Sequence, residues 1–362
     1  MWIKSFLSNR KQRVMINNSF SDWTNVTSGI PQGSVLGPLL FVIYINDLPS
    51  VVDSKVYLFA DDTKILRAIN NTTDHDKLQE DINSLVNWSR KWLLTFHPDK
   101  CQVLSIGNQL EELQNYTMSI QSALGDNIIV LDRVKEARDL GIIIDNKLSF
   151  DTHINTKAKK ANSIMGLIRR SFSYLDEQMF LLLYKAFVRP QLEYANATWN
   201  PFKKKHINLI EGVQRRATKL VPSLKNLSYK DRLIKLKLPT LSYRRLRGDM
   251  IEVYKIMYCY DKNVTNDLCA LSENSHNTRG HSKKLEHHRS RTYIRKYSFN
   301  NRVVNHWNHL PDNVINSKNM YSFERKLDKA WQNQEVKYDH TTTLIYSQIA
   351  TTSSSDLEIE EI

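Results

Sequence analysis

The sequence predicts an α+β fold, with a partial antiparallel sheet and its helices first and an all-helical region after it. Short runs of β-formers separated by turn signals fill much of residues 1–150. After Phe150 the apolar residues recur at helical spacing instead. Beyond residue 262 the chain becomes polar and basic, and its last stretch holds no Lys or Arg. These changes predict four segments: an α+β domain at 1–150, a helical domain at 151–262, a basic region at 263–337 and a disordered acidic tail at 338–362.

The α+β segment begins with signals for two hairpins. One lies within residues 11–27 around an Asn-Asn pair, and the other lies within residues 56–69 with Asp61 and Asp62 at its tip. Helical patterns and β-rich runs surround them. The remaining predicted elements are a buried helix at 38–48, which is apolar on all sides, an amphipathic helix at 74–94 with Thr73 or Asp74 as its N-cap, and strands at 100–106, 127–134 and 140–144.

The helical segment shows four apolar patterns with helical spacing. In the first of them a single stripe is formed by Ile154, Ala158, Ala161, Met165 and Ile168. The other predicted helices lie at 176–199, with an interruption at Pro190, at 206–221 and at 240–259. Residues 263–298 are polar and irregular.

The basic composition predicts an anionic partner. The net charge is +13 and the isoelectric point is about 9.4, so nucleic acid is the first candidate and an anionic membrane surface the second. A basic surface that serves only solubility is the alternative, which the clustering of the charge disfavours. The longest apolar run, residues 35–45, is interrupted by Gly-Pro and too short to span a bilayer, so we expect no membrane partner. Nothing in the sequence indicates an oligomeric state.

The cysteines indicate a reducing compartment. Their number and spacing provide neither a disulfide framework nor a zinc motif. His281, His287 and His288 lie close to two of them in sequence, but without a Cys-x-x-Cys pair they are interpreted as polar linker rather than zinc ligands. No apolar leader follows Met1, so we expect an intracellular protein, nuclear or cytoplasmic, that is not secreted. The three cysteines are Cys101, Cys259 and Cys269.

The adjacent carboxylates Asp61 and Asp62 are candidate metal ligands. Mg²⁺ prefers hard oxygen ligands and is usually held by one or two carboxylates together with substrate phosphates. A metal pair would polarise an α-phosphate, activate a 3′-hydroxyl and stabilise a leaving pyrophosphate, which points to polymerase chemistry. An ordinary polar turn is the alternative, since Asp-Asp is common in loops. The β-formers on both sides favour the metal site, because they would leave only the tip of the hairpin polar.

A loop rich in Gly and Pro, residues 29–34, precedes the apolar helix. Pro31 and Gly33 would fix a sharp bend and let the backbone approach a ligand closely. Gln32 can donate and accept hydrogen bonds, which suits a base edge or a sugar. A plain strand-to-helix turn is the alternative, and only the Asp pair downstream favours a nucleotide site.

Together these segments resemble reverse transcriptases of non-LTR retrotransposons, especially the jockey-like branch. The stretch GIPQGSVLGPLLFVIYINDLP at 29–49 is similar to the family's nucleotide- and template-contacting motif, and FADD at 59–62 is similar to its metal motif. Residues 92–101 resemble the next palm motif, and residues 140–150 resemble the hairpin that supports the primer end. The resemblance continues through patterns at 183–217 and 299–311.

The resemblance implies a palm at 1–150, a helical thumb at 151–262 and RNA-directed DNA polymerase activity by a two-metal mechanism. The implied cofactor is Mg²⁺ or Mn²⁺, and the implied partners are the element's RNA template, a DNA primer or target, and deoxynucleoside triphosphates. Asp61 and Asp62 would be the catalytic metal ligands, and Lys100 would lie near the triphosphate. The implied nucleotide or template contacts are Pro31, Gln32, Gly33, Ser34, Phe59 and Ala60, and the implied primer support is Leu140, Gly141 and Ile142.

Three basic runs after Phe150 would hold the nucleic acid. A helical thumb grips a duplex through phosphate contacts without sequence specificity. Tyr293 and Tyr297 lie among the cations of the last run, where aromatic rings suit stacking on unpaired bases. The alternative for each run is a solvated helix face. The candidate contacts are Lys157, Lys159, Lys160, Arg169, Arg170, Arg215, Arg216, Arg244 and Arg245.

The chain departs from the family pattern before residue 28. The family carries its first metal-binding Asp on a palm strand tens of residues before the Pro-Gln-Gly motif, whereas residues 1–27 hold only Asp22, whose neighbours do not resemble that strand. We therefore expect an N-terminally truncated polymerase that lacks the fingers, has an incomplete metal site, and is inactive as an isolated chain unless an upstream exon or a partner supplies the carboxylate. The alternatives are a catalytically dead nucleic-acid-binding remnant and a relict that does not fold stably, because its sheet edge is exposed.

Overall fold

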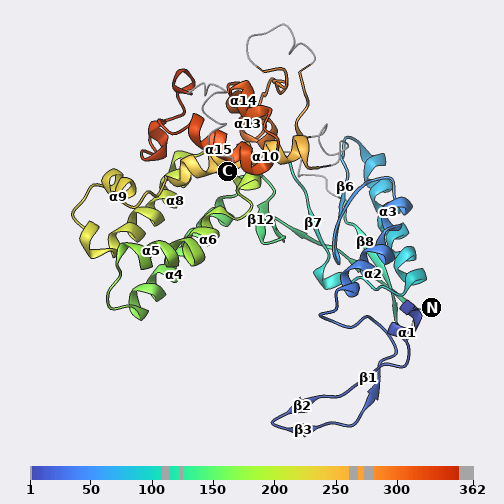
Figure 1. Cartoon of the computed structure of the whole chain (residues 1–362). Coiled ribbons are helices and arrows are strands. Elements are labelled where there is room, and N and C mark those ends of the chain that lie inside the picture. Colours follow the sequence, from blue (N-terminus) through green and yellow to red (C-terminus); the bar gives the residue numbers. More distant parts are fainter. Residues whose placement is uncertain (1, 108–113, 123–124, 261–267, 273–280, 350–362) are drawn as a thin grey trace. The chain divides into compact units, whose positions relative to one another are not determined.

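A computed structural model of the chain describes residues 2–107, 114–122, 125–260, 268–272 and 281–349. The fold is α+β, with small two-stranded sheets and many helices, as the sequence predicts (Figure 1). The chain forms two compact units, residues 1–134 and 135–362. The second unit begins before residue 150 because a hairpin at 136–145 packs its buried Ile142 into the helical core that follows.

The first unit opens with short, exposed elements. They are α1 Trp2–Leu7, β1 Lys11–Gln12, β2 Met15–Ile16, β3 Ser19–Phe20 and β4 Thr24–Asn25. The predicted hairpin is confirmed, since β2 pairs with β3 across Asn17 and Asn18, whose φ angles are 47° and 63°. Two consecutive positive φ angles are those of a two-residue hairpin turn, and Asn adopts them more readily than most residues do.

The apolar helix α2, Leu36–Ile45, forms as predicted but is not buried as predicted. Only Gly37 and Ile45 are buried in it, while Val42 and Ile43 are 53% and 63% exposed. Ile45 and Phe41 reach a small apolar cluster with Leu48 of η1, Leu48–Val51, and with the helix α3. An apolar sequence pattern does not show how many sides of the helix other elements cover. In the described residues, other elements cover one side of α2.

The long helix α3, Thr72–Trp92, supports two clusters. Its N-cap is Asn71, two residues before Thr73 and three before Asp74, the predicted N-caps. The Asn71 side chain accepts from the Asp74 N–H, and the Asp74 side chain accepts from the Asn71 N–H, which completes a capping box. One side packs under the hairpin of β5, Lys55–Phe59, and β6, Asp62–Leu66. The other side packs on β8, Thr117–Ser122. The rest of this unit is η2 Pro98–Lys100, β7 Gln102–Leu104, β9 Gly125–Val130 and β10 Asp132–Val134, with β8 antiparallel to β9 and β7 parallel to β10.

The second unit begins with the hairpin of β11, Glu136–Asp139, and β12, Ile142–Asp145, followed by α4, Asp151–Ser171. The predicted apolar stripe of α4 is confirmed, with Ala161 fully buried among its neighbours. The helical elements after α4 are α5 Glu177–Leu183, the π-helical turn η3 Tyr184–Val188, α6 Arg189–Glu193, α7 Asn196–Trp199, α8 Lys204–Ala217, η4 Thr218–Leu220, η5 Pro222–Leu224, α9 Tyr229–Lys235 and α10 Leu241–Tyr258.

The interruption predicted at Pro190 takes the form of the π-helical turn η3, which ends two residues before that proline. In η3 the Arg189 N–H bonds to the Tyr184 carbonyl, five residues back, and Pro190 stands at the start of α6, where a missing N–H is tolerated. The helix ends at Glu193 instead, and the positive φ of Ala195, 52°, sets the turn into α7.

The C-terminal part packs on α10 around a second apolar core that contains Val253, Trp307 and Phe323. Its elements are α12 Tyr293–Tyr297, α13 Phe299–Asn308, α14 Asp312–Ile315, α15 Met320–Ala330, η7 Glu335–Lys337 and η8 Tyr346–Gln348. Residues 338–349 do not behave as the predicted disordered tail: Leu344 is buried, and Gln334 exchanges two hydrogen bonds with the backbone of Ile345. The acidic end, 350–362, lies outside the described residues.

Candidate active site

The two predicted metal ligands lie in and directly after the turn of the β5–β6 hairpin. Five residue pairs join the strands, ending at Phe59 opposite Asp62, so Ala60 and Asp61 form the two-residue turn. Ala60 has a φ of 51°, which hairpin turns of this length favour at their first central position. Asp62 therefore belongs to the strand, whereas the prediction placed both acids in the tip. Both carboxylates are exposed to solvent.

The two faces of this hairpin differ. Val56, Leu58 and Ile65 pack into the apolar cluster of α2 and α3, while Tyr57 and Phe59 are 51% and 61% exposed on the opposite face. Asp62 pairs across the sheet with Phe59 and shares that open face, since directly opposite residues lie on the same side. The hairpin thus presents one carboxylate beside an exposed aromatic ring.

A buried carboxylate, Asp81 of α3, holds the base of the hairpin. It accepts hydrogen bonds from the backbone N–H groups of Asp53 and Ser54, at 2.9 and 3.1 Å, and from Arg67, at 3.1 Å. Burial raises the pKa of Asp81, but these hydrogen bonds and that of the Ser54 hydroxyl outweigh it, so the pKa lies below its ordinary value. Sequence reasoning missed Asp81; its only signal was an acid on the apolar side of an amphipathic helix.

The Pro-Gln-Gly loop is held by its own side chains. Gly29 and Gly33 have φ angles of 75° and 78°, which glycine adopts without strain. The Ser34 hydroxyl donates to the Pro31 carbonyl at 2.8 Å and accepts from the Gly37 N–H at 3.0 Å, so it is used within the loop. Gln32 is exposed and remains available for a ligand.

Lys100 lies at the end of η2 and is exposed. Phe96, four residues earlier, packs into both apolar clusters that flank α3, and thereby anchors this segment under the hairpin. In the described part of the chain, no contact joins Lys100 to Asp61 or Asp62.

The predicted primer-support residues form the turn of the β11–β12 hairpin. Leu140 and Gly141 have φ angles of 44° and 83°, and the Tyr194 hydroxyl donates to the Leu140 carbonyl at 3.0 Å. Ile142 is buried in the helical core. The next residue, Ile143, donates its N–H to Nδ1 of buried His153, at 3.1 Å. The hairpin is therefore fixed to α4 and to the end of α6 by contacts on two sides.

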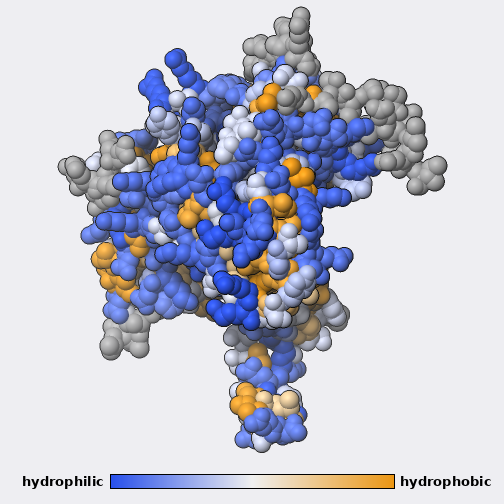
Figure 2. Space-filling model, turned by 90° about the vertical axis from the view of Figure 1, so that its left-hand side faces the viewer, coloured by the Kyte–Doolittle hydropathy of each residue, from blue (hydrophilic) through white to orange (hydrophobic). Residues whose placement is uncertain are grey.

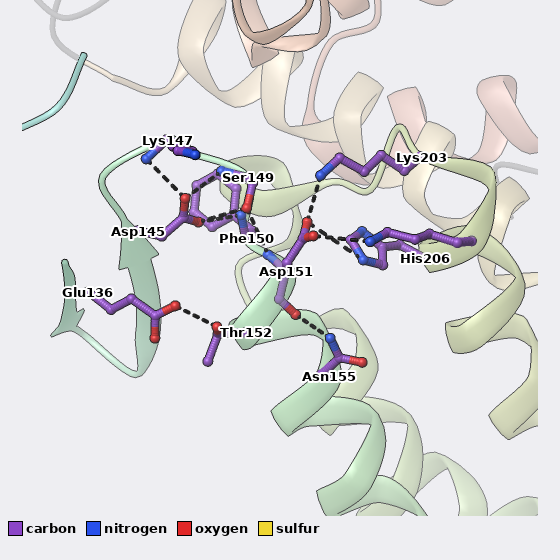
Figure 3. Close-up of polar contacts among 11 residues, drawn as sticks. Glu136, Asp145, Lys147, Ser149, Phe150, Asp151, Thr152, Asn155, Lys203 and His206 are labelled. Atoms are coloured by element: carbon purple, nitrogen blue, oxygen red, sulfur yellow. Dashed lines mark hydrogen bonds and ion pairs between the residues drawn. The ribbon is translucent and has the colours of Figure 1, made fainter. Parts of the chain in front are cut away.

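Two acids fix the junction between this hairpin and α4, as Figure 3 shows. Asp145 accepts hydrogen bonds from the backbone of Lys147, Ser149 and Phe150. Asp151 accepts from Lys203 at 2.8 Å and from Lys205 at 3.2 Å, with His206 3.6 Å away. Burial raises the pKa of Asp151, but the two lysines outweigh it and lower the pKa to about 2. The carboxylate thus stays charged and joins the start of α4 to α8.

The predicted cations of α4 and α8 lie on neighbouring helices. Arg216 of α8 donates to the Asn162 side chain of α4 at 3.0 Å, and the two helices share the core around Ala161 and Val213. Lys157 is half-buried, with its ammonium 5.8 Å from the centre of the Tyr194 ring. The exposed members of the set are Lys159, Lys160, Arg169, Arg170, Arg215 and Arg216. Figure 2, which views the side of the second unit where α4, α5, α8 and α9 lie, shows mainly hydrophilic residues there with separate hydrophobic patches.

Of the two cations predicted on α10, one forms an ion pair with another helix and the other is buried. Arg244 forms a two-pronged ion pair with Glu193 of α6. Arg245 is 3% exposed, so the prediction that it contacts nucleic acid is wrong. Sequence spacing alone does not distinguish a surface arginine from one whose guanidinium lies within the core.

The described residues supply two adjacent carboxylates but no complete metal site. Asp61 and Asp62 supply the hard oxygen donors that Mg²⁺ binds alongside substrate phosphates. Among the residues that the structure describes, no group of three or more His, Cys, Asp or Glu side chains converges as a metal site. A two-metal centre thus needs a further ligand. His281, one of the histidines weighed for zinc, is buried and lies 3.2 Å from the Trp307 carbonyl.

The chain is similar to reverse transcriptases. Residues 1–144 match the family model described as reverse transcriptase (RNA-dependent DNA polymerase). A probable RNA-directed DNA polymerase from transposon BS of Drosophila melanogaster is 29% identical over 60% of this chain and 25% of its own length. The RNA-directed DNA polymerase from mobile element jockey of Drosophila funebris is 28% identical over 59% of this chain and 24% of its own length.

The N-terminal part of the chain is therefore similar to the reverse transcriptase domains of jockey and other non-LTR retrotransposons. The matched region spans about a quarter of each of these relatives. No solved structure matches the chain. No helix of the described residues combines the length and the apolar character needed to cross a lipid bilayer.

Proposed function

We propose that this chain is the palm and thumb part of an RNA-directed DNA polymerase of a non-LTR retrotransposon. The observation that carries the proposal is the exposed pair of Asp61, in the turn of a hairpin, and Asp62, at the start of its second strand. The other face of this hairpin is anchored in a core, within the segment that matches the family. The substrates are an RNA template, a DNA primer or target, and deoxynucleoside triphosphates.

In this proposal Asp61 and Asp62 hold Mg²⁺ or Mn²⁺, which when bound supplies Lewis-acid stabilisation of the phosphoryl transfer. Gln32 and the backbone at Gly33 orient the nucleotide, together with the exposed ring of Phe59. Lys100 neutralises charge on the triphosphate. Ser34 keeps the Pro-Gln-Gly loop in shape through the two hydrogen bonds of its hydroxyl.

The helical unit holds the duplex in this proposal. The exposed cations of α4 and α8 contact phosphates, and the β11–β12 hairpin, pinned through Leu140 and Ile143, supports the primer end. The corrected set leaves out Arg245, and Arg244 serves to fix α10 to α6.

Primer extension on an RNA template with Mg²⁺ or Mn²⁺ tests the polymerase assignment. We expect little extension by the chain alone, because its described residues supply two carboxylates to the site. The same chain joined in frame to the preceding palm segment of a relative, which carries the family's first Asp, is expected to extend. In that fusion, Asp61→Asn is expected to lower the rate roughly 100-fold or more, through loss of a charged metal ligand.

Asp99→Asn is the matched control, because Asp99 is an exposed acid beside Lys100 that has no proposed role. Its extension rate is expected to stay within about twofold of the parent, as surface substitutions usually have small effects. An extending fusion that tolerates Asp61→Asn would contradict the assignment of the metal ligands.

The second candidate function is nucleic-acid binding without catalysis. The exposed cations of α4 and α8, mounted on a described core, favour it independently of the metal site. If the fusion does not extend while the chain binds a duplex with an affinity that falls steeply with salt, this second function is the one supported.

A further inference from the structure

Two basic segments that lie far apart in sequence meet through a pair of stacked aromatic rings. Phe202, just before α8, and Tyr297, at the end of α12, have ring centres 4.8 Å apart and planes inclined by 6°. The lysine next to each ring lies over it: Lys203 is 5.9 Å from the Phe202 centre, and Lys296 is 5.6 Å from the Tyr297 centre. The contact therefore joins two clusters of positive charge.

The merged surface is strongly cationic. We call it the aromatic–basic surface. Among the described residues, Asp151 is the acid that pairs with this surface, where it binds Lys203 and Lys205. The other cations of the surface form no ion pair within the described residues. Its residues are Phe202, Lys203, Lys204, Lys205, Arg289, Arg291, Tyr293, Arg295, Lys296 and Tyr297.

The core holds this surface in place. Arg302 of α13 bonds to both carboxylate oxygens of buried Asp249, at 2.8 and 2.9 Å, and to the Ala197 carbonyl at 2.7 Å. Asn301 donates to the Ser290 hydroxyl and to the Arg295 carbonyl, at 2.8 and 2.6 Å. The segment from 289 to 297 is thus tied to α10 and to the residues before α8.

Tyr293 offers an open aromatic face on this surface. Its side chain is 73% exposed and lies two residues after Arg291 and two before Arg295. A ring that stays in water among unpaired cations suits stacking on a base whose other contacts are phosphates. A duplex offers no free base face along its length, whereas a single strand does.

We propose that the aromatic–basic surface binds a single-stranded segment of nucleic acid, with Tyr293 stacking on an unpaired base and the flanking cations contacting phosphates. This deepens the proposed function, since it gives the chain a second nucleic-acid surface besides the duplex-holding cations of α4 and of the C-terminal end of α8. The chemistry fits an RNA or a DNA strand, and the two are compared in the test.

Binding of short fluorescent oligonucleotides to the full chain, followed by anisotropy over a range of salt, tests the proposal. Tyr293→Ala is expected to weaken single-strand binding roughly 5- to 100-fold, and Tyr293→Phe, which keeps the ring, to retain the parent affinity. The triple variant Arg289→Gln/Arg291→Gln/Arg295→Gln is expected to weaken single-strand binding and to reduce its logarithmic salt slope by about 2, at roughly 0.7 per lost phosphate contact.

Two controls separate this proposal from the proposed function. The control variant Lys225→Gln/Lys230→Gln/Lys318→Gln removes as much positive charge as the triple arginine variant, but from exposed positions outside both surfaces. Its single-strand affinity is expected to lie closer to that of the parent than the affinity of the triple arginine variant does. Arg169→Gln/Arg170→Gln is expected to weaken duplex binding more than single-strand binding. Comparison of RNA and DNA strands of the same sequence shows which of the two nucleic acids the surface binds more tightly.

Equal single-strand affinities for the Tyr293→Ala, triple and control variants would overturn the inference. Loss of duplex binding in Arg169→Gln/Arg170→Gln would in that case still support the duplex role of α4. Conversely, single-strand binding that depends on Tyr293 supports the inference even if no variant affects the duplex. Circular dichroism of each variant separates a loss of binding from a loss of fold.

Discussion

His153 shows how one residue links the β11–β12 hairpin to the helices that follow it. The side chain is fully buried, accepts the Ile143 N–H and lies with its ring centre 5.1 Å from that of Trp199. Burial, together with nearby Lys157, lowers the pKa of His153 to about 4. The folded protein therefore holds a neutral imidazole whose Nδ1 is an acceptor, and a proton on that nitrogen would remove the hydrogen bond.

The pH dependence of stability follows from this pKa. The unfolded chain takes up the proton near pH 6.5, before the folded chain does, so the contribution of His153 is fully present above pH 6.5 and is lost as the pH falls towards 4. The loss is expected to reach up to about 3 kcal/mol in the free energy of unfolding. Urea unfolding between pH 4 and pH 7 measures it.

His153→Asn is the informative variant, because Asn can accept the Ile143 N–H without titrating in this range. Its free energy of unfolding is expected to fall less steeply between pH 6.5 and pH 4 than that of the parent. His306 retains a slope in both proteins, since burial also lowers its pKa to about 4. Parallel curves for variant and parent would show that His153 does not titrate as described.

At the scale of elements, hairpin turns were the features that the sequence predicted best. Each is set by two residues: the Asn17-Asn18 turn was recognised from its side chains, and the Ala60-Asp61 turn from the β-formers around it. The prediction placed Asp62 in the turn, whereas strand β6 already begins at Asp62. The burial of helix α2 was harder to predict than its existence. An apolar sequence shows that a helix has apolar faces, but it does not show which elements cover those faces.

Gly141 is expected to control the stability of the β11–β12 hairpin. Its φ of 83° strains any residue with a Cβ, and an added Cβ would lie 3.5 Å from the Tyr194 ring. Gly141→Ala is expected to cost about 1 kcal/mol in the free energy of unfolding. Thermal or urea unfolding measures this, with Gly212→Ala as control, since Gly212 lies in α8 at an ordinary φ. Destabilisation of both proteins by the same amount would contradict the role of the turn.

At the scale of the whole molecule, the second unit carries most of the core. Its two apolar clusters meet along α10, which contacts the first through Leu241 and the second through Val253. The buried pair of Asp249 and Arg302 crosses from α10 to α13. Burial raises the pKa of Asp249, and the adjacent guanidinium opposes that effect by stabilising the charged carboxylate.

Removal of Arg302 is expected to destabilise the second unit and leave the first unchanged. Arg302→Ala leaves a buried carboxylate without its partner, which costs about 3–5 kcal/mol. Hydrogen exchange is expected to show faster exchange in α10 and α13, with α3 unaffected. The double variant Asp249→Asn/Arg302→Gln buries no charge and is expected to lose less stability. A single variant as stable as the double would contradict this account of the pair.

The sequence by itself determined the α+β class, most of the helices and the resemblance of the N-terminal part to reverse transcriptases, because these depend on periodicity, turn residues and short local patterns. Tertiary structure decided which cations are available. It buried Arg245, paired Arg244 with Glu193, and brought Lys203–Lys205 beside Arg289–Lys296 through the stacked rings of Phe202 and Tyr297. It also packed residues 338–349 onto the fold, although their composition predicted disorder. Burial and long-range contacts depend on which segments meet in space, and no local pattern encodes that.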